Sequence, residues 1–378
     1  MNIAQFKSHY YSGAEIVHLN NSGQALIPDV YRDLAHKWID RLYLEGALCA
    51  MEGWAQTDVT RKKLAQFLGA DEAEVSFFTT TSSALSQAAL GIPLKANDEI
   101  LTWEQEYPSN FYPWRLAAEK ANAKIIQIET ENFETPVEKI LRHVTAKTKV
   151  IAISWVQYKT GSVTDLKSLS DQLKGKDIWL VADVIQGVGV RPFNFHESGF
   201  DIVCGGSHKF LCSGYGAGYM VMKKEKMAQV NPIEVGAMTY GFPETEKSFS
   251  IKPRTDSKRF EPGSKAMVEV IAMSATLDLF SEVGISNIYK EASRLAGKLA
   301  SGLREANFNV ISPEGPILNC SPKSGQSLNE VAQKLNQAKV SFALRGPGIR
   351  LSTHGYNKDS EIDRVLEIMG EKFWDIDG

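Results

Sequence analysis

Short apolar runs alternate with amphipathic stretches between about residues 60 and 225. Several runs are apolar at successive positions, as strands buried on both faces of a sheet are. The stretches between them carry apolar residues at the three- and four-residue spacing of helices. The pattern predicts an α/β fold, with a mostly parallel sheet between helices. The predicted strands are 75–78, 99–103, 124–129, 149–156, 178–184, 201–206 and 218–223, and the predicted helices are 60–68, 110–121, 135–146 and 166–174.

The pattern weakens at residues 225–258, which are polar and rich in turn-forming residues, so a long loop is expected there. A long helical stretch at about 264–306 follows, and then short apolar runs and helices typical of a compact α+β unit. A chain of 378 residues exceeds the size of one core, so a second domain is expected. We predict a large domain at 16–258, and a small domain formed by 1–15 and 259–378.

Composition narrows the classes of function. The net charge is −3, which provides no electrostatic reason to expect nucleic acid or a membrane as a partner. The sequence has no run of about 18 apolar residues and no signal-peptide pattern at its start, so we expect a soluble cytoplasmic protein. Its four cysteines lie far apart without a CxxC pair, so we expect reduced thiols and no metal site.

Candidate chemistry lies at the ends of two predicted strands. One strand ends in Asp183, and the strand at 201–206 leads directly into Ser207, His208 and Lys209. Open α/β sheets bind ligands beyond the carboxyl ends of their strands. A carboxylate keeps a pyridinium nitrogen protonated, and a lysine amine forms an imine with an aldehyde, so this pair suits pyridoxal phosphate. Taken singly, Asp183 also fits a turn aspartate, and Lys209 a solvated lysine.

A hydroxyl-rich segment follows the first predicted strand. Residues 79–83 read Thr-Thr-Thr-Ser-Ser and precede a helical pattern. Backbone N–H groups at a helix start, joined by hydroxyls, can bind a phosphate. Simple capping of the helix by serine or threonine is the alternative.

Together these residues resemble the class V aminotransferase group of fold-type I pyridoxal-phosphate enzymes. This group includes cysteine desulfurases, kynureninase-like proteins and isopenicillin N epimerase-like proteins. The resemblance spans nearly the whole chain, from His18-Leu19-Asn20-Asn21-Ser22-Gly23 to the segment GIRLSTHGYN. It implies a seven-stranded large domain, a smaller α+β domain, and pyridoxal 5′-phosphate held on Lys209 as a Schiff base.

The resemblance also implies roles for particular residues. Residues 106–114 are similar to the family pattern EHHxNxxPW, which puts Tyr107 where a histidine usually stacks on the cofactor ring. A tyrosine can stack, but it transfers protons less readily near neutral pH. A core aromatic is the alternative for Tyr107. The other implied cofactor contacts are Thr81, Ser82 and Ser83 at the phosphate, Gln157 or Tyr158 beside the ring, Asp183 at the ring nitrogen, Gln186 at the phenolic oxygen, and Ser207 and His208 at the phosphate.

Two further matches concern the partner subunit and the substrate. Residues 259–264 resemble the motif RFExGT, whose last hydroxyl, here Ser264, reaches the phosphate of the neighbouring subunit, so a homodimer with shared sites is implied. Arg350 occupies the family position that binds the α-carboxylate of an amino acid, and a guanidinium suits a carboxylate. Arg345 is a second candidate, and Tyr158 a third substrate contact. A helix cap at Ser264 and surface ion pairs of the arginines are the alternatives.

One departure from the family limits the chemistry. Cysteine desulfurases need a mobile cysteine just before the carboxylate-binding arginine, and residues 340–348 contain none, which excludes persulfide chemistry on that loop. We therefore predict an enzyme acting on the α-carbon of an amino acid. An aminotransferase ranks first, a C–S or other β-lyase second and an epimerase third, and the retained Lys209, Asp183 and Arg350 argue against a non-catalytic scaffold.

Overall fold

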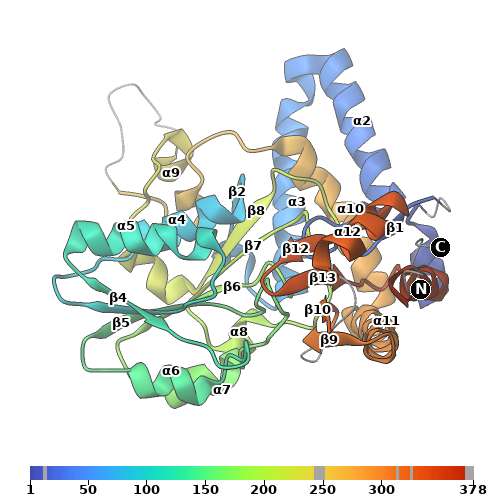
Figure 1. The fold of residues 1–378 in the computed structure, drawn as a ribbon. Helices are drawn as coiled ribbons and strands as arrows, with labels where there is room; N and C mark the ends of the chain where they lie inside the picture. The colour runs from blue at the N-terminus through green and yellow to red at the C-terminus, as the bar shows by residue number, and fades with distance from the viewer. Residues whose placement is uncertain (12–14, 242–251, 312–314, 324–326, 371–378) are drawn as a thin grey trace, which may run out of the picture.

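A seven-stranded sheet forms the centre of the computed structural model, which describes residues 1–11, 15–241, 252–311, 315–323 and 327–370 (Figure 1). The strand order is β2-β8-β7-β6-β5-β3-β4. Only β8 runs antiparallel to its neighbours within this sheet, so the prediction of a mostly parallel sheet is confirmed. The strands are β2 (Val75–Phe78), β3 (Glu99–Trp103), β4 (Lys124–Ile128), β5 (Thr148–Ser154), β6 (Trp179–Asp183), β7 (Ile202–Gly206) and β8 (Gly218–Met222).

Both faces of this sheet are buried, which explains the continuous apolar runs in the sequence. In β5, Val150 and Ala152 pack on the face covered by α4 (Thr81–Gly91) and α5 (Tyr112–Ala121). Ile151 and Ile153 pack on the opposite face. The helices that contribute to that second face include α3 (Ala50–Leu68), α6 (Val137–His143), α7 (Leu166–Gln172) and α10 (Met267–Val283).

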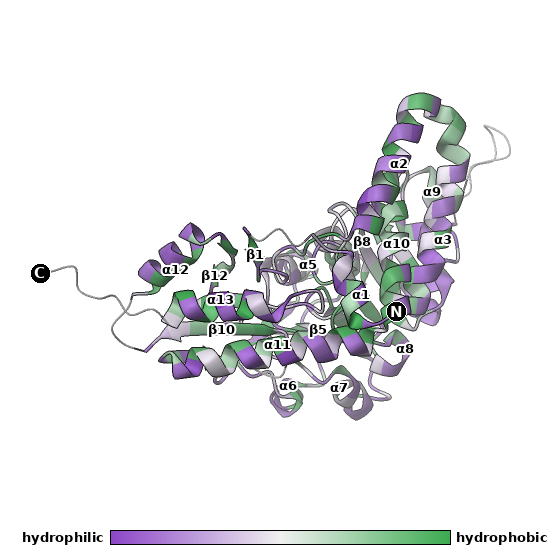
Figure 2. Cartoon of the chain, turned by 90° about the vertical axis from the view of Figure 1, so that its right-hand side faces the viewer, coloured by the Kyte–Doolittle hydropathy of each residue, from purple (hydrophilic) through white to green (hydrophobic). Residues whose placement is uncertain are grey.

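A helical hairpin projects from the body of the molecule (Figure 1). It consists of α2 (Asp29–Glu45), the short 3₁₀ turn η1 (Gly46–Cys49) and α3. The predicted helices do not include α2, and the helix predicted at 60–68 in fact begins at residue 50. Large apolar side chains near the tip are exposed. Hydrophobic residues colour part of the tip in Figure 2, so this part of the hairpin lacks the polar outer face on which helix prediction relies.

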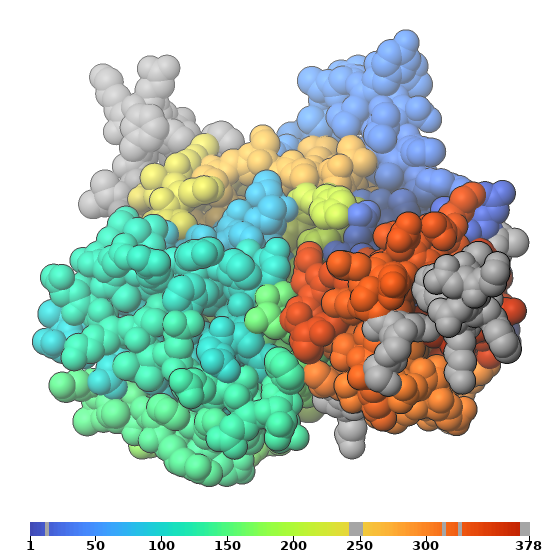
Figure 3. All heavy atoms as spheres, in the orientation of Figure 1, coloured from blue at the N-terminus to red at the C-terminus, as the bar shows by residue number. Residues whose placement is uncertain are grey.

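The C-terminal part of the chain forms a compact unit on one side of the molecule, beside residues from the middle of the chain (Figure 3). It contains a four-stranded antiparallel sheet in the order β12-β13-β10-β9, and the short strand β1 (Val17–His18) pairs with β11. Its elements are α11 (Ile285–Glu305), β9 (Phe308–Ile311), β10 (Ile317–Pro322), α12 (Leu328–Gln337), β11 (Val340–Ser341), β12 (Ala343–Arg345), β13 (Gly348–Ser352) and α13 (Asp359–Gly370).

Two predictions for this region need correction. The helical stretch at 264–306 is two helices, α10 and α11, because Gly284 lies between them with a φ of 80°. That backbone conformation suits glycine and ends α10. The apolar run 340–344 is also two strands, because β11 pairs with β1 whereas β12 pairs with β13.

The expected loop at 225–258 contains short helices in its described part, and residues 242–251 lie outside the described residues. The remaining short elements are α1 (Ile3–Ser8), α8 (Phe195–Ser198), α9 (Ala237–Tyr240), η2 (Glu72–Glu74), η3 (Pro108–Asn110), η4 (Lys224–Gln229) and η5 (Ser257–Phe260). Phe6 of α1 and Leu277 of α10 share one hydrophobic cluster with the central sheet. The domain boundary at residue 258 stays a prediction.

None of the helices in the described ranges combines the length and the hydropathy needed to span a bilayer. The cytoplasmic location expected from the sequence stays a prediction. All four cysteines are free and buried.

Candidate active site

Asp183 and Lys209 lie at neighbouring strand ends. Asp183 is the last residue of β6 and is paired in register with Cys204 of β7, and Lys209 follows the end of β7 by three residues. Burial raises the pKa of the Asp183 carboxyl, while the N–H of Ile185, 3.0 Å from Oδ1, and the charge of Lys209 oppose that rise. The sheet therefore holds a buried acid within electrostatic range of an amine.

The surroundings of Lys209 favour the neutral form of its amine. Burial lowers its pKa to about 8; Asp183 opposes this effect, and the positive charges of Arg350 and Arg345 add to it. A lysine with this pKa is unprotonated in about one molecule in ten near pH 7, far more often than a solvated lysine. The unprotonated amine is the form that attacks an aldehyde or accepts a proton.

Two tyrosines connect Lys209 to the strand that carries Arg350. The Lys209 Nζ lies 5.5 Å from the centre of the Tyr107 ring. The rings of Tyr107 and Tyr158 meet edge to face, with their centres 5.1 Å apart. Arg350 Nη1 donates a 2.7 Å hydrogen bond to the Tyr158 carbonyl. The structure thus brings together the predicted ring-stacking residue, the amine and the predicted substrate-binding residues.

Arg350 is almost completely buried in β13. Its Nη2 lies 3.5 Å from Asn20 Oδ1, and its Nε has no hydrogen-bond partner among the described residues. Burial lowers the pKa of Arg350 to about 10, with the charge of Arg345 as the next cause, so the guanidinium stays protonated near neutral pH. It can therefore offer donors to a carboxylate.

The hydroxyl-rich segment forms the start of α4, close to the end of β7. Thr80 caps the helix, because its side chain accepts a hydrogen bond from the Ser83 N–H. Thr81 Oγ1 is buried without a partner among the described residues, whereas Ser82 is exposed and donates to Ser109 Oγ at 2.7 Å. A Cβ on Gly206 would lie 2.6 Å from Thr81 Oγ1, so this close approach requires glycine. A hollow of about 230 Å³ borders Ser82 and Ser83.

The two predicted glutamines are held by hydrogen bonds. Gln186 Nε2 donates to the Ser22 carbonyl at 3.0 Å, which ties the segment containing Ser22 to this edge of the sheet. Gln157 Nε2 donates to Glu106 Oε1, also at 3.0 Å. Both glutamines are buried, and in each the amide oxygen has no partner within the described residues.

The loop after β7 positions Ser207 and His208. Ser207 Oγ donates to the Gly214 carbonyl at 2.5 Å. The His208 ring stacks on Tyr215, with ring centres 4.7 Å apart. Burial, followed by the charge of Lys209, lowers the pKa of His208 to about 4, so this imidazole is neutral near pH 7.

Glu106 is a site residue for which the sequence suggested no role. Its buried carboxyl accepts hydrogen bonds from Asn110, from Gln157, and from both the N–H and the hydroxyl of Ser154. Burial raises its pKa to about 7 despite these bonds. Ser154 is the register partner of Asp183, so Glu106 ties the Tyr107 segment to the strand ends of the site. The position of Glu106 beside Tyr107 in the EHHxNxxPW-like segment was the available signal.

Ser264 is not brought to the other candidates by a described contact. It lies exposed in the segment just before α10. Arg345, at the end of β12, is also exposed, and its Nη1 bonds to the carbonyl of Leu344.

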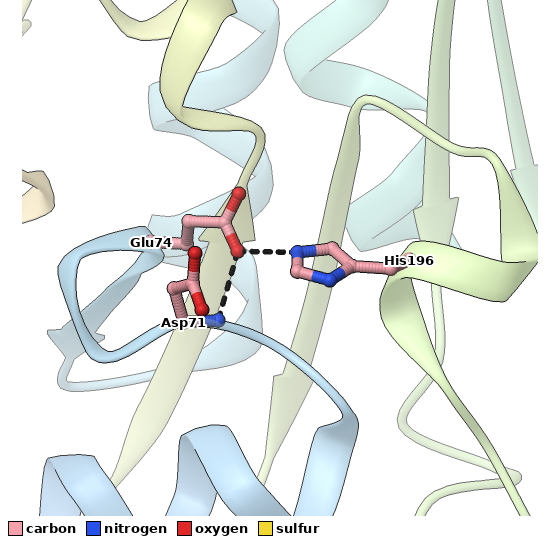
Figure 4. Close-up of side chains that lie close together, drawn as sticks. All are labelled: Asp71, Glu74 and His196. Atoms are coloured by element: carbon pink, nitrogen blue, oxygen red, sulfur yellow. Dashed lines mark hydrogen bonds and ion pairs between the residues drawn. The ribbon is translucent and has the colours of Figure 1, made fainter.

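A group of three possible metal ligands lies at the opposite edge of the sheet. Asp71, Glu74 and His196 have ligand atoms within 4.8 Å of one another (Figure 4). Glu74 Oε2 already accepts hydrogen bonds from the Asp71 N–H at 2.9 Å and from His196 Nε2 at 2.7 Å. Glu74 precedes the amino end of β2, whereas the α4 start follows its carboxyl end. This group therefore belongs to the packing of η2 against α8, and not to the candidate site.

The site fits pyridoxal phosphate. Asp183 supplies the buried carboxylate that a pyridinium nitrogen needs, and Lys209 supplies the amine. The Thr81 hydroxyl, which has no partner among the described residues, and the start of α4 against the glycine end of β7 could hold a phosphate.

This fold and this pair of strand ends define a pyridoxal-phosphate-dependent enzyme. The chain belongs to the family described as aminotransferase class-V, whose model matches residues 49–365. The resemblance inferred from the sequence is thus confirmed. An uncharacterized aminotransferase of Bacillus subtilis, YcbU, is 23% identical over 85% of this chain and 85% of its own length. A probable cysteine desulfurase of Pyrococcus abyssi is 24% identical over 94% of both chains.

Solved structures share the fold. The apo structure of a cysteine desulfurase from Thermococcus onnurineus matches with a TM-score of 0.88 and 21% identity, over 97% of both chains. The cystine C–S lyase C-DES, in complex with cysteine persulfide, matches with a TM-score of 0.89 and 18% identity, over 95% of this chain and 98% of that chain. The fold-type I prediction is therefore confirmed.

Proposed function

We propose that this enzyme is an aminotransferase that holds pyridoxal phosphate on Lys209. The observation that carries the proposal is the buried Asp183 at the end of β6, within electrostatic range of a Lys209 amine whose pKa is lowered to about 8. When bound, the cofactor supplies an electron-withdrawing ring that stabilises negative charge at the substrate α-carbon.

The other residues divide by the part of the cofactor that they would hold. Tyr107 would stack on the ring, since the Lys209 amine lies near its face. The carboxylate of Asp183 would bind the ring nitrogen. The phosphate would be held by Thr81, Ser82, Ser83, Ser207 and His208, and the ring substituents by Gln157 and Gln186.

Arg350 and Lys209 would then act on the amino acid. The guanidinium of Arg350 holds the α-carboxylate, because it is buried, protonated and has an unpartnered Nε among the described residues. Once the amine of the substrate has taken its place on the cofactor, the free Lys209 Nζ would accept the proton of the substrate α-carbon and would later donate a proton. An amine with a pKa near 8 can both accept and donate this proton near neutral pH.

The cysteines argue against sulfur transfer. Burial raises the pKa of Cys204, Cys212 and Cys320, so these thiols are poor nucleophiles near pH 7. The hairpin formed by β12 and β13, which precedes Arg350, contains no cysteine. Both observations support transamination over desulfuration.

A panel of L- and D-amino acids, tested with and without a 2-oxo acid, decides the reaction type. We expect the cofactor to convert stably to its amine form when only an amino acid is added, and to return when the 2-oxo acid is added. Pyruvate with ammonia or sulfide, formed without an amino acceptor, would select the β-lyase instead. Racemised substrate would select the epimerase.

A homodimer with shared sites belongs to the same proposal. Ser264 is exposed, and the α4 start has a hollow beside Ser82 and Ser83, so each chain has both a hydroxyl to offer and space to receive one. The tip of the α2–α3 hairpin also exposes large apolar side chains, which is typical of a protein interface.

A further inference from the structure

Three cationic side chains come from segments that meet beside Tyr158. Ala343 of β12 pairs with Arg350 of β13, so Arg345, two residues further along β12, faces the same side of the hairpin as Arg350. Gly348, the register partner of Arg345, has no side chain to separate the two guanidinium groups. The two arginines are therefore diagonal neighbours on one face.

Lys159 reaches the same place from the loop after β5. Asn319 Nδ2 donates to the carbonyls of both Arg345, at 2.7 Å, and Lys159, at 3.2 Å. A Cβ on Gly346 would lie 3.5 Å from the Cβ of Lys159. The Lys159 Nζ lies 5.7 Å from the centre of the Tyr158 ring, whose residue also bonds to Arg350 through its carbonyl.

The charge of this group is not balanced by carboxylates. Within the described ranges, neither arginine nor Lys159 forms an ion pair, and the arginines bond to neutral carbonyl and amide oxygens. Glu104, whose carboxyl pKa is lowered by its bonds to the N–H and hydroxyl of Thr130 and to a smaller extent by Lys159, forms no ion pair with Lys159, so it offsets the charge of Lys159 only in part. One substrate α-carboxylate at Arg350 would leave the charge of Arg345 uncompensated and that of Lys159 only partly compensated.

We propose that Arg345 and Lys159 bind a second carboxylate beside the one at Arg350, so that the substrate is an amino acid with a carboxylate side chain. This inference rests on the proposed function, because it takes Arg350 as the α-carboxylate site. Arg345 and Lys159 would only bind the second carboxylate and would form or break no covalent bond. Arg345 supplies planar paired donors and Lys159 a point charge.

Kinetics with Arg345→Gln and Lys159→Gln test this inference. For wild-type enzyme we expect kcat/KM to be higher for aspartate or glutamate than for alanine. Each substitution should lower kcat/KM for the dicarboxylic substrate about 10- to 100-fold, and that for alanine less than about threefold, because a charge-assisted bond is lost only with the former. Arg115→Gln, an exposed change on α5, is the matched control. Equal losses for both substrates would overturn the proposal, as would a wild-type preference for alanine.

Binding of an unreactive dicarboxylate provides a second readout. Succinate should raise the melting temperature of the holoenzyme more than butyrate does, and Arg345→Gln should abolish the difference. Equal effects of succinate and butyrate on wild type would contradict a second carboxylate site. Absence of a visible cofactor band would instead contradict the proposed function, and the succinate comparison, made on that cofactor-free protein, would still decide whether the two-carboxylate site exists.

Discussion

Glu106 is a buried carboxyl of the site that forms no ion pair with a cationic side chain of the described residues. Glu106 is surrounded by hydrogen-bond donors from Ser154, Asn110 and Gln157, all of them uncharged. The hydrogen bonds favour the ionised form of Glu106, whereas burial disfavours it. Burial is the larger effect, so the pKa of Glu106 rises to about 7. The charge of this residue therefore changes over the physiological pH range.

Glu106 predicts a pH dependence of stability. A carboxyl whose pKa is raised on folding contributes stability that is lost as pH rises through the folded-state value. Between pH 5 and 8, the unfolding free energy of wild type should fall by on the order of 2–3 kcal/mol more than that of Glu106→Gln, whose side chain at residue 106 does not titrate. Urea unfolding of both proteins at the two pH values measures this change.

Glu119→Gln, at an exposed position of α5, is the control and should follow wild type. Parallel stability curves of wild type and Glu106→Gln would show that the carboxyl at residue 106 does not titrate in this range.

At the residue scale, the sequence allowed the positions of some site residues to be predicted, but not the contacts between them. Asp183 and Lys209 could be predicted because strand ends in a parallel sheet meet at one edge, which depends only on local pattern. The role of Glu106 could not, because it depends on donors from residues 110, 154 and 157, which only the folded chain brings together. The proximity of Arg345 and Lys159 could not be predicted either, because it also depends on contacts between segments that are distant in the sequence.

The tip of the helical hairpin exposes a group of large apolar side chains. Tyr43, Leu44, Leu48 and Met51 are between 77% and 88% exposed near its tip. Four large apolar side chains together are rarely left in water on a monomer. This exposure also explains why the sequence did not predict α2, since its apolar positions do not form one inward face.

We expect the hairpin tip to contact the second subunit. Leu48→Glu should raise the dimer dissociation constant at least about tenfold, because a charge would be buried without a partner. Analytical ultracentrifugation of wild type and variant measures this, and Lys174→Glu, exposed after α7, is the control. A wild-type protein that sediments as a monomer would contradict the dimer, and an unchanged dimer in Leu48→Glu would remove the tip from the interface.

At the scale of the whole molecule, the central sheet was the most predictable part. Its strands are apolar on both faces, so each appears in the sequence as a short continuous run of apolar residues, without the alternating polar residues of a strand that has one face in water. The C-terminal unit was predicted less well, because a glycine break at residue 284 and the division of residues 340–345 between two sheets depend on tertiary pairing. Strand order and the meeting of the α4 start with the end of β7 likewise follow from packing.

The central claim is that Lys209 carries the cofactor, and localising the cofactor tests it most directly. Holoenzyme is reduced with borohydride, digested, and its peptides are analysed by mass spectrometry. We predict that the mass of reduced pyridoxal phosphate appears on the peptide containing Lys209, that Lys209→Ala lacks this modification, and that Lys147→Ala, at the amino end of β5, retains it. Modification of a different lysine in wild type, or of none, would contradict the account.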